Sequence, residues 1–121
     1  MKILPPLVHG FLDYSVVLVF FLVPTLFNFS PTASALVYVV GAGQLIVSLL
    51  TVYPLGALKL IPFPIHGVLE SVVAVGLIGA PWLFGFATET SAQIFFVGAG
   101  VALLAVVAIT DYKGKGTGQS Q

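Results

Sequence analysis

Two histidines and two acidic residues recur at one spacing in separate parts of the chain. His9 precedes Asp13 by four residues, and His66 precedes Glu70 by the same interval. Residues four apart lie on one face of a helix, so the members of each pair can act together. Imidazole and carboxylate groups can pair with each other, bind a divalent metal or carry protons. These four residues are therefore the candidate site.

Three roles for these four residues remain open. In the first, which is structural, the carboxylates accept hydrogen bonds and tie helices together, and we expect no cofactor. In the second, all four residues bind a metal, or His9 and His66 ligate a haem or chlorin axially. In the third, the group moves protons during transport of a small solute. The absence of an obvious polar path through the outer half of the predicted bundle counts against this third role.

Further polar residues fall near the acids in the predicted bundle. At 1.5 Å per residue, Gln44 lies about 12 Å from the inner end of its span, level with Asp13. Tyr14 and Ser71 follow the acids directly in the chain. Ser48 and Thr51 lie nearer the inner end, and Tyr53 is expected near the surface. The supporting polar cluster comprises Tyr14, Gln44, Ser48 and Ser71.

The composition of the chain indicates an integral membrane protein. Of 121 residues, 59% are hydrophobic and only 7% are charged, with a mean hydropathy of +1.15. Soluble domains carry about 25% charged residues, so an ordinary soluble globule is excluded. The net charge of zero and the lack of arginine give no support to nucleic-acid binding. With no cysteine, disulfides and thiolate sites are excluded as well.

The apolar residues are grouped into stretches that match the thickness of a bilayer. A helix needs about 20 mostly apolar residues to cross the hydrocarbon core. Short connections between such helices make neighbours antiparallel. We therefore predict an all-α bundle of four transmembrane helices, which cover residues 7–26, 32–52, 64–83 and 90–109.

The lysines predict how the bundle is oriented. All four lie at the chain ends or in the middle link, and the other two loops contain none. Because positive residues stay on the cytoplasmic side, both termini are expected in the cytoplasm. Residues 114–121 are rich in glycine and polar residues and are predicted to form a flexible cytoplasmic tail. The lysines are Lys2, Lys59, Lys113 and Lys115.

Proline and glycine positions suggest how the helices end and pack. Pro24 and Pro81 lie near the outer ends of their spans, where we expect the helix to break. Trp82 suits the outer interface. Small residues spaced four apart let helices approach closely in lipid. We expect such packing at Gly76–Ala80 and Gly98–Ala102, and also at Gly41, Gly43 and Gly100.

The chain matches itself when it is shifted by 57 residues. His9-Gly10 falls on His66-Gly67, and Pro24 falls on Pro81. The shift gives 16 identities in 55 pairs without a gap. This composition alone would give roughly 4 or 5, so the match is the signature of a repeat. We predict two parallel two-helix repeats, residues 2–56 and 59–113, related by a pseudo-twofold axis along the membrane normal.

Several motifs in these repeats resemble the SPW repeat family of small bacterial membrane proteins. The nearest likeness is Ala80-Pro81-Trp82-Leu83-Phe84-Gly85-Phe86, and Tyr53-Pro54-Leu55-Gly56 and Ile61-Pro62 add to it. The resemblance extends from about Lys2 to Tyr112. It implies the repeated two-span fold and a place in the bacterial inner membrane, and it brings no established activity.

These observations favour a single membrane domain, residues 1–113, with no enzymatic role. The motifs of hydrolases, phosphate loops and zinc proteases are all missing from the sequence. We expect an accessory or interaction subunit, with a second copy or a larger membrane complex covering its apolar surface. Metal or tetrapyrrole binding is the alternative, and proton-coupled transport is a further one.

Overall fold

The computed structural model describes residues 2–112, which form four α-helices and no strand. This confirms the predicted all-α class. The helix ends lie within two residues of those predicted. The tail at 114–121 and the lysines at 113 and 115 lie outside the described residues. The helices are α1 Pro6–Leu26, α2 Pro31–Leu50, α3 Phe63–Leu83 and α4 Thr90–Ile109.

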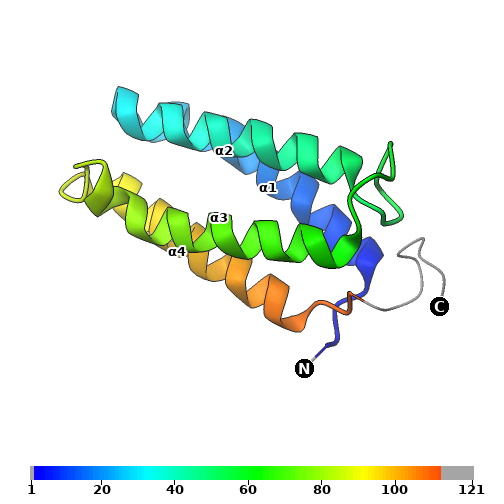
Figure 1. Ribbon diagram of the computed structural model, residues 1–121. Helices are drawn as coiled ribbons and strands as arrows, with labels where there is room; N and C mark the ends of the chain where they lie inside the picture. Colours follow the sequence, from blue (N-terminus) through cyan, green and yellow to red (C-terminus); the bar gives the residue numbers. More distant parts are fainter. Residues whose placement is uncertain (1, 113–121) are drawn as a thin grey trace.

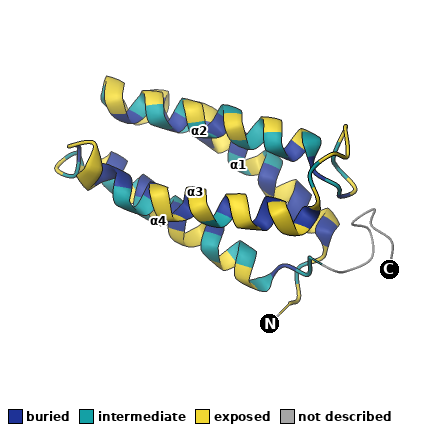
Figure 2. Cartoon of the chain, viewed as in Figure 1, coloured by how far each residue is buried: buried dark blue, intermediate teal, exposed yellow. Residues whose placement is uncertain are grey.

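Each helix is 20 or 21 residues long and is apolar enough to cross a membrane. At 1.5 Å per residue, this length corresponds to about 30 Å, the thickness of the hydrocarbon core. Exposed side chains lie along every helix (Figure 2), and many of them are large and hydrophobic. Such extensive apolar surface suits contact with lipid and is rare on soluble monomers. These features are typical of a multi-pass membrane protein.

The helices pack as two antiparallel hairpins that lie side by side (Figure 1). α1 packs against α2, α3 packs against α4, and a smaller contact joins α2 to α3. The start of α1, the end of α4 and the link between α2 and α3 share one end of the molecule. We call this the linker end. The short loops after α1 and after α3 form the opposite end, which we call the loop end.

The loop end shows how each hairpin turns. Pro24 and Pro81 are buried inside their helices, which continue two residues further. The prolines themselves do not interrupt the helices, which end at Leu26 and Leu83 as the apolar stretches predicted. There Asn28 and Gly85 have φ angles of 52° and 79°, which turn the chain out of the helix. The Ser30 amide donates to Glu89 Oε2 at 2.9 Å, so one loop is bonded to the other.

The interior toward the loop end is apolar and is packed closely around two glycines. Phe20, Val37, Leu77 and Phe96 are among the buried residues of this core. A Cβ atom on Gly41 would lie 3.1 Å from Phe20, and one on Gly100 would lie 2.6 Å from the Ala74 carbonyl oxygen. The expectation of packing at Gly43, Gly76 and Gly98 is wrong. A Cβ at any of these three would meet nothing within 4 Å, because they face outward.

The two hairpins correspond at two different spacings. Phe63 follows Pro6 by 57 residues, whereas Thr90 follows Pro31 by 59 residues. The difference arises in the loops, since the second loop is two residues longer than the first. Buried positions of α2 and α4 therefore correspond at 59, and the gapless match at 57 does not describe these two helices. The corresponding buried residues are Ala33 and Ala92, Val37 and Phe96, and Gly41 and Gly100.

Candidate functional site

The four predicted ligand residues meet at one point near the linker end. His9 and Asp13 lie in the first turns of α1, and His66 and Glu70 lie in the first turns of α3. All four are buried, with exposed fractions of 0 to 3%. One ligand atom from each residue lies within 4.8 Å of the other three. Two helices from different hairpins thus contribute equally to one cluster.

Each imidazole contacts both carboxylates through Nε2. His9 Nε2 lies 3.2 Å from Asp13 Oδ1 and 3.3 Å from Glu70 Oε1. His66 Nε2 lies 3.0 Å from Asp13 Oδ2 and 3.3 Å from Glu70 Oε2. Two of these contacts join residues four apart on one helix, and the other two cross between hairpins.

Threonines at the ends of α2 and α4 fix the orientation of the imidazoles. Thr51 Oγ1 donates its single proton to the Val47 carbonyl at 2.6 Å and lies 2.7 Å from His66 Nδ1. Thr110 Oγ1 donates to the Val106 carbonyl at 2.6 Å and lies 2.7 Å from His9 Nδ1. Because each hydroxyl proton is already used, each ring must donate from Nδ1. Nε2 of both rings is then turned toward the carboxylates.

A carboxamide and a phenol hold the carboxylates from the other side. Gln44 Nε2 donates to Asp13 Oδ1 and to Glu70 Oε2, both at 3.1 Å. Tyr53 Oη donates to Asp13 Oδ2 at 2.9 Å. The prediction that Gln44 lies level with the acids is thus confirmed. Outer partners of this kind orient ligands and restrict how they move.

Aromatic rings separate the cluster from the linker end. The Phe63 ring lies 5.1 Å from the His9 ring and 4.6 Å from the Tyr112 ring, measured between centroids. Tyr53 and Phe63 are fully buried. Burial, followed by the charge of Asp13, raises the pKa of Tyr53 above its ordinary value. Burial, followed by the charge of Glu70, raises the pKa of Tyr112 in the same direction. Both phenols therefore keep their protons.

Three of the predicted supporting residues do not join the cluster. Tyr14 donates to the Leu55 carbonyl at 2.8 Å, and Ser71 donates to the Gly67 carbonyl at 2.8 Å. Ser48 is buried, but its hydroxyl has no hydrogen-bond partner among the described residues. Adjacency in sequence to an acid is the reason that Tyr14 and Ser71 were expected. On a helix, adjacent residues point about 100° apart, so they face elsewhere.

Sequence reasoning missed Thr110 and Phe63, named Thr51 only as a polar residue nearer the inner end, and placed Tyr53 near the surface. A signal for three of the cluster's neighbours is present, since Thr-x-Tyr occurs at 51–53 and again at 110–112. The two copies are 59 residues apart, so a gapless match at 57 hides them. Only a match that allows for the longer second loop brings them into register.

Two buried atoms in the centre of the cluster lack a hydrogen bond. His9 Nε2 and Glu70 Oε1 face each other at 3.3 Å, and neither has a hydrogen-bond partner in the described part of the chain. If both imidazoles gave up the Nε2 proton to bind a metal, the cluster would carry a charge of −2, which one divalent cation would neutralise. A cation bound to both atoms would also satisfy their lone pairs.

The same geometry does not favour axial ligation of a tetrapyrrole by His9 and His66. Their ring centroids are 5.4 Å apart and the rings are inclined at 78°. Both Nε2 atoms contact the same two carboxylates within 3.3 Å, so the carboxylates occupy the positions that an axial iron would take.

No protein-family model, curated protein or solved structure matches the chain.

Proposed function

We propose that this is a non-enzymatic membrane protein that binds one divalent metal through His9, Asp13, His66 and Glu70. The observation that carries the proposal is the convergence of four buried ligand atoms, one from each residue. In a tetrahedral zinc site with bonds of about 2.0–2.1 Å, neighbouring ligand atoms lie about 3.3 Å apart. The four nitrogen–oxygen separations here are 3.0 to 3.3 Å, and they involve both oxygens of each carboxylate. A set with one ligand atom from each residue spans up to 4.8 Å, so the ligands would draw closer together around a metal.

The chemistry of the ligands supports Zn²⁺ in particular. Two imidazole nitrogens and two carboxylate oxygens suit zinc, which accepts both kinds of donor at tetrahedral positions. The threonine hydroxyls that accept from Nδ1 correspond to the outer partners usual for metal-bound histidine. With four protein ligands, the site has no open position for substrate, which is typical of a structural zinc.

A structural role follows from where the ligands come from. His9 and Asp13 belong to one hairpin, and His66 and Glu70 belong to the other. A shared metal would join the hairpins at the linker end, where the interior is polar. Toward the loop end, apolar packing already joins them.

Metal analysis of the purified protein tests this function. We expect about one zinc per chain after purification from membranes of zinc-supplemented cells. Glu70→Gln keeps the shape of the side chain but weakens the ligand, so metal content should fall several-fold. Glu89→Gln is the matched control, because Glu89 is an acid of the loop end, and it should retain the metal. A metal-free wild-type protein that also binds no added zinc would contradict the proposal.

A second candidate is the role of an accessory or interaction subunit, which the apolar surface supports. A groove of about 440 Å³ lies between α1 and α4 and is lined almost wholly by apolar side chains. We propose that a second copy or a larger membrane complex uses this surface. Native mass measurement in a mild detergent checks it, and a single chain in every condition would contradict it. Proton-coupled transport is not favoured, because the described core toward the loop end is apolar.

The finer architecture is also proposed here. The two hairpins are inferred to be parallel repeats related by a pseudo-twofold axis along the membrane normal. The two histidine–threonine bonds support this, since each crosses from one hairpin to the other. Lys2 precedes α1 and Lys59 belongs to the link between α2 and α3, and these positions at the linker end support cytoplasmic termini. Membership of the SPW repeat family and location in the bacterial inner membrane rest on the sequence resemblance.

A further inference from the structure

A second groove runs between α2 and α3 and ends on the polar cluster. It has a volume of about 380 Å³. Two of its walls, Val39 and Val72, have exposed fractions above 60%, so the groove opens toward the lipid. Its inner lining includes Gln44, His66 and Glu70. An apolar space with a few converging polar groups is the usual form of a small-molecule site.

Gln44 provides the hydrogen-bonding group of this groove. Both of its N–H groups are engaged by Asp13 and Glu70, which fixes the orientation of the carboxamide. Among the described residues, no donor bonds its Oε1 atom, and the side chain is only half-buried. Gln44 lies six residues before the end of α2, or about 9 Å into the bilayer. A carbonyl acceptor at that depth, out of reach of bulk water, is costly unless a donor reaches it.

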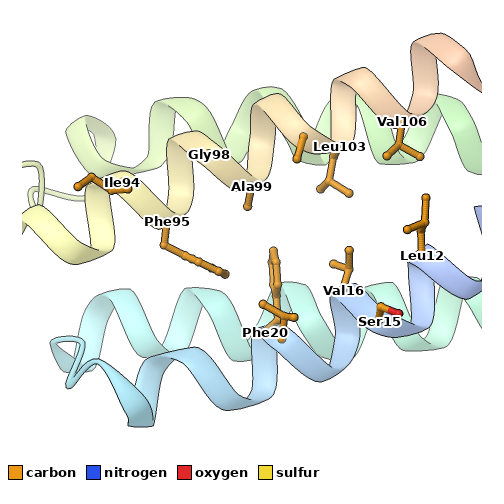
Figure 3. A pocket seen from close by; sticks show the side chains of 12 residues that line it. Leu12, Ser15, Val16, Phe20, Ile94, Phe95, Gly98, Ala99, Leu103 and Val106 are labelled. Atoms are coloured by element: carbon orange, nitrogen blue, oxygen red, sulfur yellow. The ribbon is translucent and has the colours of Figure 1, made fainter.

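The groove between α1 and α4 provides the contrast (Figure 3). There the position that corresponds to Gln44, at the spacing of 59, is the buried Leu103. Ser15 is the one polar side chain among its lining residues, and Ser15 already donates to the Phe11 carbonyl. The two grooves are similar in size, but only the one between α2 and α3 is lined by a carboxamide oxygen that accepts no bond from the described residues.

We infer that the groove between α2 and α3 binds a neutral, lipid-soluble phenol or quinol whose hydroxyl donates to Gln44 Oε1. The lining residues of the groove include no lysine or arginine that could pair with the anionic head of a fatty acid or a phospholipid. The carbonyl oxygen of a ketone or quinone is itself a hydrogen-bond acceptor, so it could not bond to Gln44 Oε1. A phenolic hydroxyl supplies the missing donor, and its ring and alkyl chain suit the apolar walls. Gly43 leaves room for the ring, because a Cβ there would meet nothing within 4 Å.

This inference does not depend on a metal in the cluster. It rests on the Gln44 oxygen that lacks a donor and on the apolar walls of the groove. Both are present whether the carboxylates bind a metal or pair only with the imidazoles. Failure of metal binding would therefore leave the inference standing, and failure of phenol binding would leave the metal proposal standing.

A matched pair of ligands tests the hydrogen bond. 4-Pentylphenol and its methyl ether, 4-pentylanisole, are titrated onto the full-length protein in nanodiscs and followed by ligand-detected NMR. The phenol should bind about tenfold more tightly than the ether, since one donor is lost. Gln44→Leu should remove this preference. Equal binding of phenol and ether to the wild type, or no binding of either, would overturn the inference.

A matched pair of variants tests the location without touching the cluster. Gly43 lines the groove between α2 and α3, and Gly98 lines the groove between α1 and α4. Neither has neighbours within 4 Å of a built Cβ, so both accept a larger side chain. Gly43→Phe should abolish binding of the phenol, whereas Gly98→Phe should leave it unchanged. Loss of binding in Gly98→Phe alone would overturn the inference.

Discussion

Each imidazole of the cluster is held at both of its nitrogen atoms. Nδ1 donates to a threonine hydroxyl, and Nε2 points at two carboxylates. The threonine hydroxyl can only accept from the ring, because its own proton is donated to a carbonyl of the preceding helical turn. The tautomer is therefore decided by a residue that is not itself part of the cluster. Such fixed orientation is what a tetrahedral metal site requires.

Replacing the threonines should disturb the cluster without removing any ligand. Thr51→Val keeps the shape but leaves the His66 Nδ1 proton buried and unbonded, which costs about 1–3 kcal/mol. We expect a lower free energy of unfolding in detergent and a zinc affinity reduced about 10- to 100-fold. Thr25→Val, at an exposed threonine, is the control and should stay within about 0.5 kcal/mol of the wild type. Wild-type zinc affinity in Thr51→Val would contradict the assigned tautomer.

The buried phenol of Tyr53 predicts a loss of stability in alkali. Its pKa is raised above the ordinary 10.0 by burial and by the Asp13 charge, so the unfolded chain loses this proton first. The stabilising contribution is present below pH 10 and is lost as the pH rises above it. The free energy of unfolding should therefore fall less steeply above pH 10 in Tyr53→Phe than in the wild type. Identical slopes would show that this phenol does not titrate differently on folding.

The sequence predicts the four ligand residues but not the residues that orient them. The ligands are found because a spacing of four on a helix is a local rule, and the same spacing recurs. His9 and Thr110 are 101 residues apart, and only the packing of both hairpins brings them together. Tyr53 was placed near the surface, because its burial depends on how the linker folds back over the cluster. No local pattern carries that information.

At the scale of the helix, two glycines on α4 differ sharply although they are only two residues apart. Gly100 faces α3, where a Cβ would lie 2.6 Å from the Ala74 carbonyl oxygen, and Gly98 faces outward. We expect Gly100→Ala to destabilise the protein by about 1–3 kcal/mol through overpacking. Gly98→Ala should be neutral or stabilising by up to about 1 kcal/mol, because alanine favours the helix. Thermal unfolding in detergent measures both.

If the two variants unfolded together, the close approach of α3 and α4 at Gly100 would be wrong. Small-residue spacing did not predict which glycine lies in the contact, since Gly98 has a small residue four positions away, Ala102, and Gly100 does not. The helices themselves were predictable, because continuous apolar stretches of bilayer length have few other solutions. Rotation of a helix about its axis is decided by its partner, and that part of the fold requires the structure.

At the scale of the whole molecule, the arrangement of ends and loops predicts which segments share a side of the membrane. The native chain has no cysteine, so single cysteines report cleanly. Leu58, in the link between α2 and α3, and Thr88, in the loop after α3, are both exposed and suit the variants Leu58→Cys and Thr88→Cys. In intact cells, a membrane-impermeant maleimide should label Thr88→Cys and spare Leu58→Cys until the cells are opened. The reverse result would invert the proposed orientation, and labelling of both would contradict spanning hairpins.

The crossed histidine–threonine bonds have an implication for how such a protein could be divided. His9 is oriented by Thr110 of the second hairpin, and His66 is oriented by Thr51 of the first. A polypeptide ending after the first hairpin would keep His9 and Asp13. It would also keep the Thr51 hydroxyl, whose partner His66 lies in the second hairpin. Two such fragments, made separately, would complement each other only by assembling face to face. If the two hairpins arose from one, a single hairpin would have needed a second copy of itself to complete these bonds.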